Sequence, residues 1–184
     1  VAYRKLMRQE DYRTSAEYGD QALEHGLTAL ILMEEVLPPK DPELAGIYDS
    51  VGKIYEYRKE WHKSIEFGKR RIDLLEEIFD QYHPSLSSAY NNTAIVLREA
   101  GMKEESVQFS RRAIKMVGRS LDPFHIEMAY AHWTLAYTYD KFGETKKGVM
   151  EMEHVLAVLL KVLPSDHPNI ETARKGLEEF RAKL

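Results

Sequence analysis

Residues 24–35 read EHGLTALILMEE and residues 66–77 read EFGKRRIDLLEE, so several residue types recur after 42 positions without a gap. Tyr48 and Tyr90 are separated by the same interval. Three histidines also keep it, at His83, His125 and His167. A fixed period of this length is typical of a solenoid, in which like units stack one on another. Solenoids present long surfaces to other chains, so the period favours binding over catalysis.

The composition excludes several classes of function. The chain has 184 residues, the size of one ordinary domain. Its formal net charge of −4 argues against nucleic acid as a partner. It has no cysteine, which excludes disulfides and Cys-based zinc sites and suits the cytoplasm, where we expect the protein to lie. No apolar run approaches the roughly 20 residues of a membrane span, so no membrane partner is expected.

Helical spacing predicts antiparallel helix pairs. In the clearest unit, apolar residues indicate one helix from Pro84 to Glu99 and a second that begins near Lys103, with the turn at Gly101. Small residues stand where the two helices must cross closely, at Ala94, Ser106 and Ala113. The neighbouring units place Lys59 and Gly143 at their turns.

We therefore predict an all-α, right-handed superhelical solenoid that forms one domain. Its repeats are expected at about residues 1–40, 41–82, 83–124 and 125–166, followed by a capping helix at 167–184. Residues 17–37 match a second helix, with Ala22, Gly26 and Leu30 at its crossing positions. Residues 3–15 are expected to be the first helix of that pair, although polar residues occupy several of its apolar positions.

The family resemblance rests on the pattern Tyr90, Ala94, Leu97, Gly101, Ser106 and Ala113, which resembles the tetratricopeptide repeat. The unit of 42 residues, with His83-Pro84 and Asn91-Asn92, looks like the longer repeat of the kinesin light chain type. The resemblance covers about residues 17–184. It implies a scaffold or adaptor that is not an enzyme and needs no cofactor, and that holds a partner protein or peptide in a concave groove lined by the first helices.

Nine residues are predicted to line that groove: Asp49, Lys53, Asn91, Asn92, Ile95, Arg98, Tyr130, Trp133 and Tyr137. Three of them, Tyr130, Trp133 and Tyr137, share one helix face outside the core stripe, and large amphipathic rings are typical binding anchors. An alternative is that the C-terminal helix covers these rings. Asparagine amides can both donate to and accept from a peptide backbone, and the resemblance implies this role at Asn92. Acidic and basic residues are mixed, so the charge of the ligand stays open.

No catalytic or metal site is expected. His83, His125 and His167 should be spread along the stack in structural linker roles rather than converge on a metal. His132 lies on an apolar face and is interpreted as a packed core histidine. Glu34-Glu35 and Glu76-Glu77 are interpreted as surface pairs. The basic groups Lys69-Arg70-Arg71 and Arg111-Arg112 are interpreted as a solvated outer face.

Two alternatives to a peptide-binding module remain. The first is a regulatory or structural segment of a larger protein, left open because the chain begins at Val1 rather than at Met. Glu60-Trp61, Phe67-Gly68 and Tyr82-His83-Pro84 are similar to the C-terminal helical domain of SET-and-MYND lysine methyltransferases. The second is self-association as a homo-oligomer, through the aromatic groove or through the incompletely capped N-terminal end.

Overall fold

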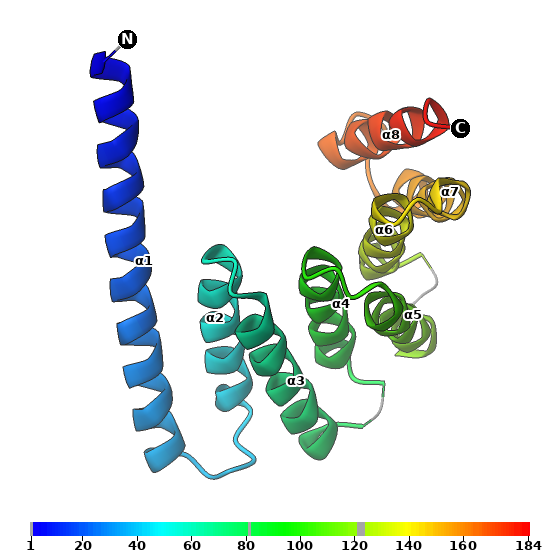
Figure 1. Cartoon of the computed structure of the whole chain (residues 1–184). Coiled ribbons are helices and arrows are strands. Elements are labelled where there is room, and N and C mark those ends of the chain that lie inside the picture. The colour runs from blue at the N-terminus through cyan, green and yellow to red at the C-terminus, as the bar shows by residue number, and fades with distance from the viewer. Residues whose placement is uncertain (1, 81, 121–123) are drawn as a thin grey trace. The chain divides into compact units, whose positions relative to one another are not determined.

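The computed structural model describes residues 2–80, 82–120 and 124–184, with the side chains of residues 19–80, 82–119 and 124–184. Every regular element in these ranges is a helix (Figure 1). The helices are α1 (Ala2–Val36), α2 (Glu43–Tyr57), α3 (Trp61–Ile78), α4 (Pro84–Glu99), α5 (Lys103–Ser120), α6 (Ile126–Lys141), α7 (Thr145–Val162) and α8 (Pro168–Arg181). Contacts divide the chain into an N-terminal unit, Val1–Leu74, and a C-terminal unit, Leu75–Leu184. That all repeats form one domain stays a prediction.

Glycines allow the helices of the N-terminal unit to approach closely. A Cβ atom added to Gly26 of α1 would stand 3.0 Å from Cδ1 of Ile54 on α2. A Cβ atom added to Gly52 of α2 would stand 3.4 Å from Cβ of Phe67 on α3. Beside this crossing, the rings of Tyr55 and Phe67 stack with centroids 5.6 Å apart. Gly26, predicted to lie at a helix crossing, does lie at a close contact, but its partner is α2 and not a first helix at residues 3–15.

The N-terminal pair of helices is not formed as the sequence predicted. α1 is one continuous helix of 35 residues (Figure 1). The other pairs turn at residues with positive φ, which is 59° at Lys59, 83° at Gly101 and 79° at Gly143. Glu17 stands 42 residues before Lys59, and the helix passes through it. Residues 3–15 carry polar residues where a folded-back helix would need apolar ones, so folding back would bury little, and glutamate lets the helix continue. With no first helix folded back, Ala22 is exposed rather than at a crossing.

The C-terminal unit contains two helix pairs, α4–α5 and α6–α7, and ends in α8. Small buried residues again mark the crossings: Ala94, Ser106 and Ala113 are each 0% exposed. A Cβ atom on Gly148 of α7 would stand 3.0 Å from the carbonyl oxygen of Ala136 on α6. These positions confirm the predicted pairs and their turns.

The segment predicted as a capping helix, residues 167–184, contains α8, and its capping role stays a prediction. Its apolar stripe is buried, with exposed fractions of 1% for Ile170, 0% for Ala173, 6% for Leu177 and 1% for Phe180. Arg174, Glu178 and Arg181 are exposed on α8 at the positions where α6 carries His132, Ala136 and Tyr139. A helix packed on this face of α8 would have to bury these charges.

The linker histidines begin the first helices, as predicted for a structural role. Nδ1 of His83 accepts from the backbone N–H of Ser85 at 3.2 Å, ahead of α4. His125 and His167 do the same ahead of α6 and α8, at 3.2 Å and 3.1 Å. A side-chain acceptor at this position satisfies a backbone donor that the helix itself leaves free. Among the described helices, none combines the length and the apolar character required to cross a membrane.

Candidate groove between α4 and α6

A hollow of about 560 Å³ lies between the two first helices of the C-terminal unit. α4 contributes Ser88, Asn91, Asn92, Ile95 and Arg98, and α6 contributes Glu127, Tyr130, Trp133, Thr134 and Tyr137. Helical spacing of three and four residues aims both sets at the same space. Seven of the nine residues predicted from the sequence therefore come together in one hollow.

The other two predicted residues, Asp49 and Lys53, lie on α2 in the N-terminal unit and do not line this hollow. Nζ of Lys53 is 2.6 Å from Oδ2 of Asp49, one turn away on the same helix. Arg71 of α3 makes an ion pair with the other carboxylate oxygen of Asp49. Asp49 is therefore occupied by two cations of its own unit.

The three aromatic residues of α6 differ in how much of each ring is open. Tyr130 is 36% exposed, whereas Trp133 and Tyr137 are half-buried. Trp133 and Tyr137 pack against the core cluster that α8 completes. The ring of Tyr137 meets Phe180 of α8 edge to face, with centroids 5.2 Å apart. The alternative that the C-terminal helix covers these rings is thus realised for part of Tyr137, and Tyr130 is the most open anchor.

The two asparagines lie on the opposite wall. Both Asn91 and Asn92 are half-buried in α4. Atom Oδ1 of Asn91 is buried and has no hydrogen-bond partner among the residues that the structure describes. A buried acceptor without a partner costs about 1–3 kcal/mol. Asn91 therefore holds hydrogen-bonding capacity that the fold does not use.

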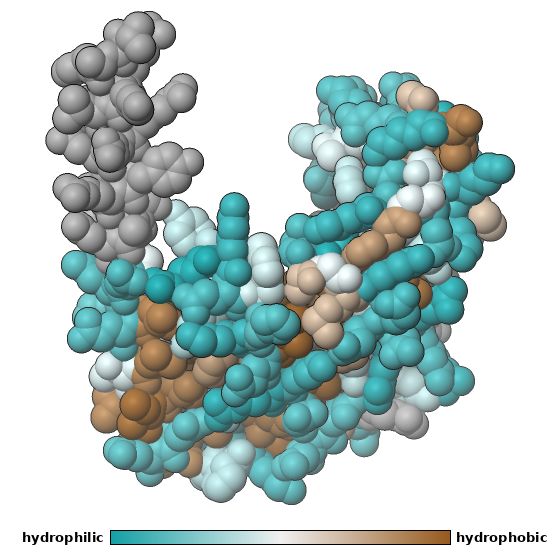
Figure 2. Space-filling view, viewed as in Figure 1, coloured by the Kyte–Doolittle hydropathy of each residue, from teal (hydrophilic) through white to brown (hydrophobic). Residues whose placement is uncertain are grey.

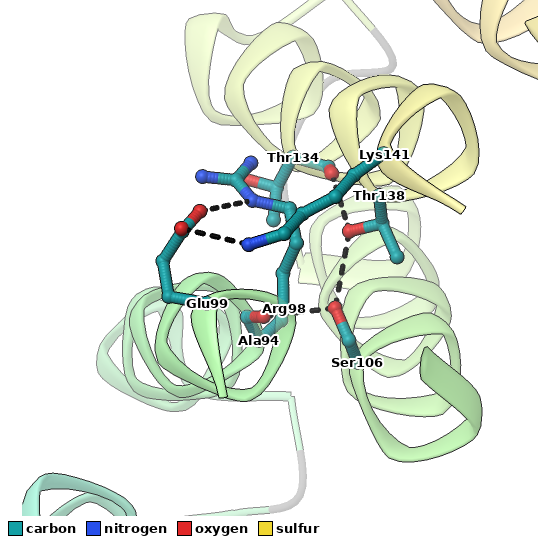
Figure 3. A network of polar contacts seen from close by, with 7 residues as sticks. All are labelled: Ala94, Arg98, Glu99, Ser106, Thr134, Thr138 and Lys141. Atoms are coloured by element: carbon teal, nitrogen blue, oxygen red, sulfur yellow. Dashed lines mark hydrogen bonds and ion pairs between the residues drawn. The ribbon is translucent and has the colours of Figure 1, made fainter. Parts of the chain in front are cut away.

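The charges at the ends of the groove are unequal. At one end, Nε of Arg98 and Nζ of Lys141 each donate to a different oxygen of Glu99, both at 2.8 Å (Figure 3). Lys141, and to a smaller extent Arg98, holds the pKa of the Glu99 carboxyl below its usual range. Two cations share one carboxylate, so this end carries a net positive charge. Glu127 gives the other end a negative charge.

A buried hydroxyl network fixes the two walls of the groove. Ser106 of α5 donates to the carbonyl oxygen of Ala94 on α4 at 2.8 Å, and its Oγ lies 3.0 Å from Oγ1 of Thr138 on α6 (Figure 3). Thr138 itself donates to the carbonyl oxygen of Thr134 at 2.8 Å. The two contacts of Ser106, with Ala94 and with Thr138, therefore join α4, α5 and α6. Both hydroxyl side chains are 0% exposed.

A polar knot, defined as a Glu–Tyr–Arg triple, was missed by the sequence reasoning. In the N-terminal unit, Glu34 accepts from Tyr48 at 3.0 Å and from Arg70 at 2.6 Å, while the Arg70 guanidinium lies 4.5 Å from the Tyr48 ring centroid. In the C-terminal unit the equivalent triple is Glu76, Tyr90 and Arg112, with distances of 2.6 Å, 2.8 Å and 4.7 Å. These glutamates and arginines do lie on a solvated surface, as interpreted, but they are also paired with one another across helices. The common spacing of 42 residues was the signal that could have found them.

His132 is packed, with its side chain 16% exposed, but its partner is polar rather than apolar. Its Nδ1 lies 2.6 Å from Oε2 of Glu151, and its ring stacks on His154 with centroids 5.1 Å apart. His132 and His154 occupy the tyrosine and arginine positions of the knot in the third repeat, where Gly118 replaces the glutamate. Within the described residues, no three His, Cys, Asp or Glu side chains converge in a way that could hold a metal ion.

Comparison with known proteins identifies the class. Residues 43–119 match the family model of the tetratricopeptide repeat. The chain resembles a putative kinesin light chain of Podosopora anserina with nearly identical TPR-like repeats, at 17% identity and a TM-score of 0.77, over 97% of this chain and 85% of that one. It also resembles BtubC (BKLC) from P. vanneervenii, at 17% identity and a TM-score of 0.79, over 94% of this chain and 68% of that one. No curated protein sequence matches it.

A further similar structure is a Rap protein complexed with competence and sporulation factor, at 15% identity and a TM-score of 0.71. That match covers 95% of this chain but 47% of the Rap protein, so the chain spans about half of its length. Residues 43–119 thus match the tetratricopeptide repeat, and the predicted resemblance to repeats of the kinesin light chain type is confirmed. At these identities the structural likenesses establish the fold, an all-α solenoid of the tetratricopeptide type. Solenoids of this type generally mediate protein–protein interaction.

Proposed function

We propose that the chain is a non-enzymatic binding module that holds an extended peptide segment of a partner protein in the groove between α4 and α6. The observation that carries the proposal is the hollow of about 560 Å³, which joins aromatic anchors on one wall to amide groups on the other. Pockets that bind ligands commonly combine a largely apolar lining with a few polar groups that fix orientation.

Each wall has a distinct task. The rings of Tyr130 and Trp133 offer apolar area with a polar edge, which suits the side chain of a bound peptide. The amides of Asn91 and Asn92 suit its backbone, because each carries donors and an acceptor. Rotation of the Asn91 carboxamide would exchange its buried oxygen for the nitrogen, so a peptide N–H could use the acceptor that the fold leaves without a partner.

The matched Rap protein supports a ligand-binding role by analogy, since it is described as complexed with competence and sporulation factor. Its identity of 15% carries the fold only, so the ligand of this chain must be found by experiment.

A peptide library screened against the intact chain tests the proposal, with hits measured by fluorescence anisotropy. Tyr130→Ala and Asn92→Ala should each weaken binding by about tenfold or more, the usual size for groups near the centre of an interface. Met150→Ala is the matched control, because Met150 is a large side chain on α7, 62% exposed and outside the groove. Hits that all three variants bind as well as the wild type would refute the groove as the site. A complete absence of hits would instead favour an intramolecular occupant.

A further inference from the structure

We propose that the C-terminal half of α5 carries a second binding surface, which takes an acidic segment of a partner protein. The surface is the α5 basic face, defined as Arg111, Arg112, Lys115 and Arg119. Their helical spacing places all four on one side of α5, and all four are exposed. In Figure 2 apolar surface gathers over the C-terminal half of α1, whereas the surface over α5 is mainly hydrophilic.

The neighbouring second helices show that this charge is not a general feature of the repeat. The equivalent positions, 42 residues away, carry two bases and two acids on α3, and one base and one acid on α7 with histidine counted as neutral. They are Lys69, Arg70, Asp73 and Glu77 on α3, and Glu153, His154, Ala157 and Lys161 on α7. Of these three helices, α5 alone concentrates one sign of charge at these positions. A face that only needs to be solvated requires no such excess.

The helix dipole explains one of the four cations. The negative end of a helix attracts cations within its last turn only. Arg119 stands in the last turn of α5, whereas Arg111 and Arg112 lie in the middle of the helix. The acids of α5, Glu104 and Glu105, lie in its first turn, away from the α5 basic face. The remaining cations therefore need another explanation.

Contacts within the chain leave most of this positive charge without a counter-charge. Arg112 makes an ion pair with Glu76 at 2.8 Å. Arg111 and Arg119 each donate to a tyrosine hydroxyl, which is neutral near pH 7. Lys115 makes no hydrogen bond or ion pair with any residue that the structure describes. Within the described part of the chain, one of the four cations is thus balanced by a carboxylate.

A pocket of about 390 Å³ opens beside the α5 basic face. It is lined by Glu76 of α3, by Tyr82 of the following linker and by Arg112, Lys115 and Met116 of α5. All five residues belong to the C-terminal unit. The guanidinium of Arg119 lies 5.0 Å from the centroid of the Tyr82 ring, so this ring is held beside the cations. The pocket can therefore hold one side chain of a segment whose carboxylates meet Lys115 and Arg119.

An extended acidic segment suits this surface better than other anions do. The stretch from Arg111 to Arg119 covers about 12 Å along the helix, a distance that about four extended residues span. Acidic side chains at alternate positions of such a segment point to the same side and can meet several cations together. A small free anion would engage only part of the face. The formal net charge of −4 of the whole chain disfavours a long polyanion such as nucleic acid.

Fluorescence anisotropy with the intact chain tests the proposal. The probe is a short labelled peptide in which glutamate and serine alternate, and a peptide with glutamine in place of glutamate is its control. The wild type should bind the glutamate peptide more weakly as salt is raised, and should not bind the glutamine peptide. Lys115→Glu should weaken binding by about threefold or more, because it removes an attraction and adds a repulsion. Adding Arg119→Glu should bring the loss to about tenfold or more.

Lys146→Glu is the matched control variant. Lys146 is exposed in the first turn of α7 and has no ion pair with the described residues. It stands where α5 carries Glu104, outside the α5 basic face. The variant makes the same change of charge as Lys115→Glu and should bind the peptide as the wild type does. Circular dichroism should show equal helix content in every variant.

A wild type that does not bind the glutamate peptide overturns the proposal. Binding that Lys115→Glu leaves unchanged, or that Lys146→Glu weakens equally, overturns it as well. Tighter binding of a thymidine oligonucleotide through Lys115 would show that the surface takes nucleic acid and not an acidic protein segment. None of the α5 basic face lines the hollow between α4 and α6. Tyr130→Ala should therefore leave binding of the glutamate peptide unchanged, so this proposal and the peptide-binding groove fail or hold separately.

Discussion

At the scale of single residues, the linker histidines show what a repeat interval can reveal. Their spacing of 42 residues predicted structural roles, and each proves to cap a first helix through Nδ1. Nδ1 must be unprotonated to accept this bond. His83 differs from the other two in that its ring also stacks on Phe79, with centroids 3.8 Å apart. His125 has no such stacking contact with another residue that the structure describes and is therefore the cleaner site for measuring the cap.

His125→Ala should lower the free energy of unfolding by about 0.5–2 kcal/mol, because the backbone N–H of Glu127 loses its acceptor. Denaturant titration measures the change. His125→Asn supplies the control, since an asparagine side chain is a good N-cap acceptor and should restore most of the loss. Equal losses in the two variants would mean that the imidazole acts otherwise than as a cap.

The Glu99 carboxyl gives a prediction for pH. Its pKa is held below the usual range chiefly by the hydrogen bond from Lys141, so the folded state favours the ionised form. Such a group contributes stability above its unfolded pKa and loses it as pH falls through the lowered folded value. The stability difference between wild type and Glu99→Gln should therefore be below about 1 kcal/mol near neutral pH, since the pair is partly solvated, and should shrink in acid below about pH 4.5. Unfolding titrations at several pH values check this, and a difference that grows in acid would contradict it.

The sequence predicted which residues line the candidate groove better than it predicted their contacts. Tyr130, Trp133 and Tyr137 were found because helical spacing separates their face from the core stripe. The burial of Tyr137 by Phe180 could not be found, because it depends on where α8 packs. The polar knots were missed because the surface pattern was examined one helix at a time. Such a pattern does not show that Glu34 of α1 and Tyr48 of α2 come into contact.

At the scale of helices, the sequence predicted boundaries where local chemistry is decisive. Pro84 and Pro168 stand at the first turns of α4 and α8, and Gly101 and Gly143 take the positive φ of their turns. The prediction failed at Glu17, where no such residue forces a turn. Polar residues in the segment 3–15 had already shown that a folded-back first helix would lack an apolar face. The helix propensity of Glu17 and the lack of an apolar face on residues 3–15 together explain why α1 is one long helix.

The capping helix offers a sharp test at this scale. Phe180→Ala should cost about 3–5 kcal/mol of unfolding free energy, because Phe180 is 1% exposed and fills the space beside Gly148 and Tyr137. Glu179→Ala, one residue away on the exposed face of α8, should change stability by less than about 0.5 kcal/mol. Denaturant unfolding of both variants compares them. A small loss for Phe180→Ala would mean that α8 does not complete the core.

At the scale of the whole molecule, the repeats are equivalent in backbone but not in polar detail. The Glu–Tyr–Arg knot is present twice, at intervals of 42 residues, with closely similar distances. In the third repeat it is replaced by Gly118, His132 and His154, and Glu151 takes the place held by Phe67 and Phe109 in the earlier repeats. The carboxylate has thus moved from the first position of the knot to the place of the phenylalanine. In the third repeat the ring of His132 therefore still has a carboxylate partner, but that carboxylate belongs to Glu151.

This equivalence makes the knot transferable. A variant with Gly118→Glu, His132→Tyr, Glu151→Phe and His154→Arg should be more stable than the wild type by about 1–2 kcal/mol, as consensus substitutions in repeats commonly are. A Cβ atom at Gly118 would stand 3.5 Å from Cε of Met128, which is ordinary contact, so the site has room for a side chain. Part of any gain would come from removing a helical glycine, which alone is worth roughly 0.5–1 kcal/mol. Gly118→Ala measures that part in the same denaturant titration. If the fourfold variant is no more stable than Gly118→Ala, the stability of the knot depends on other residues around it in the first two repeats. The knot is then not a property of the repeat itself.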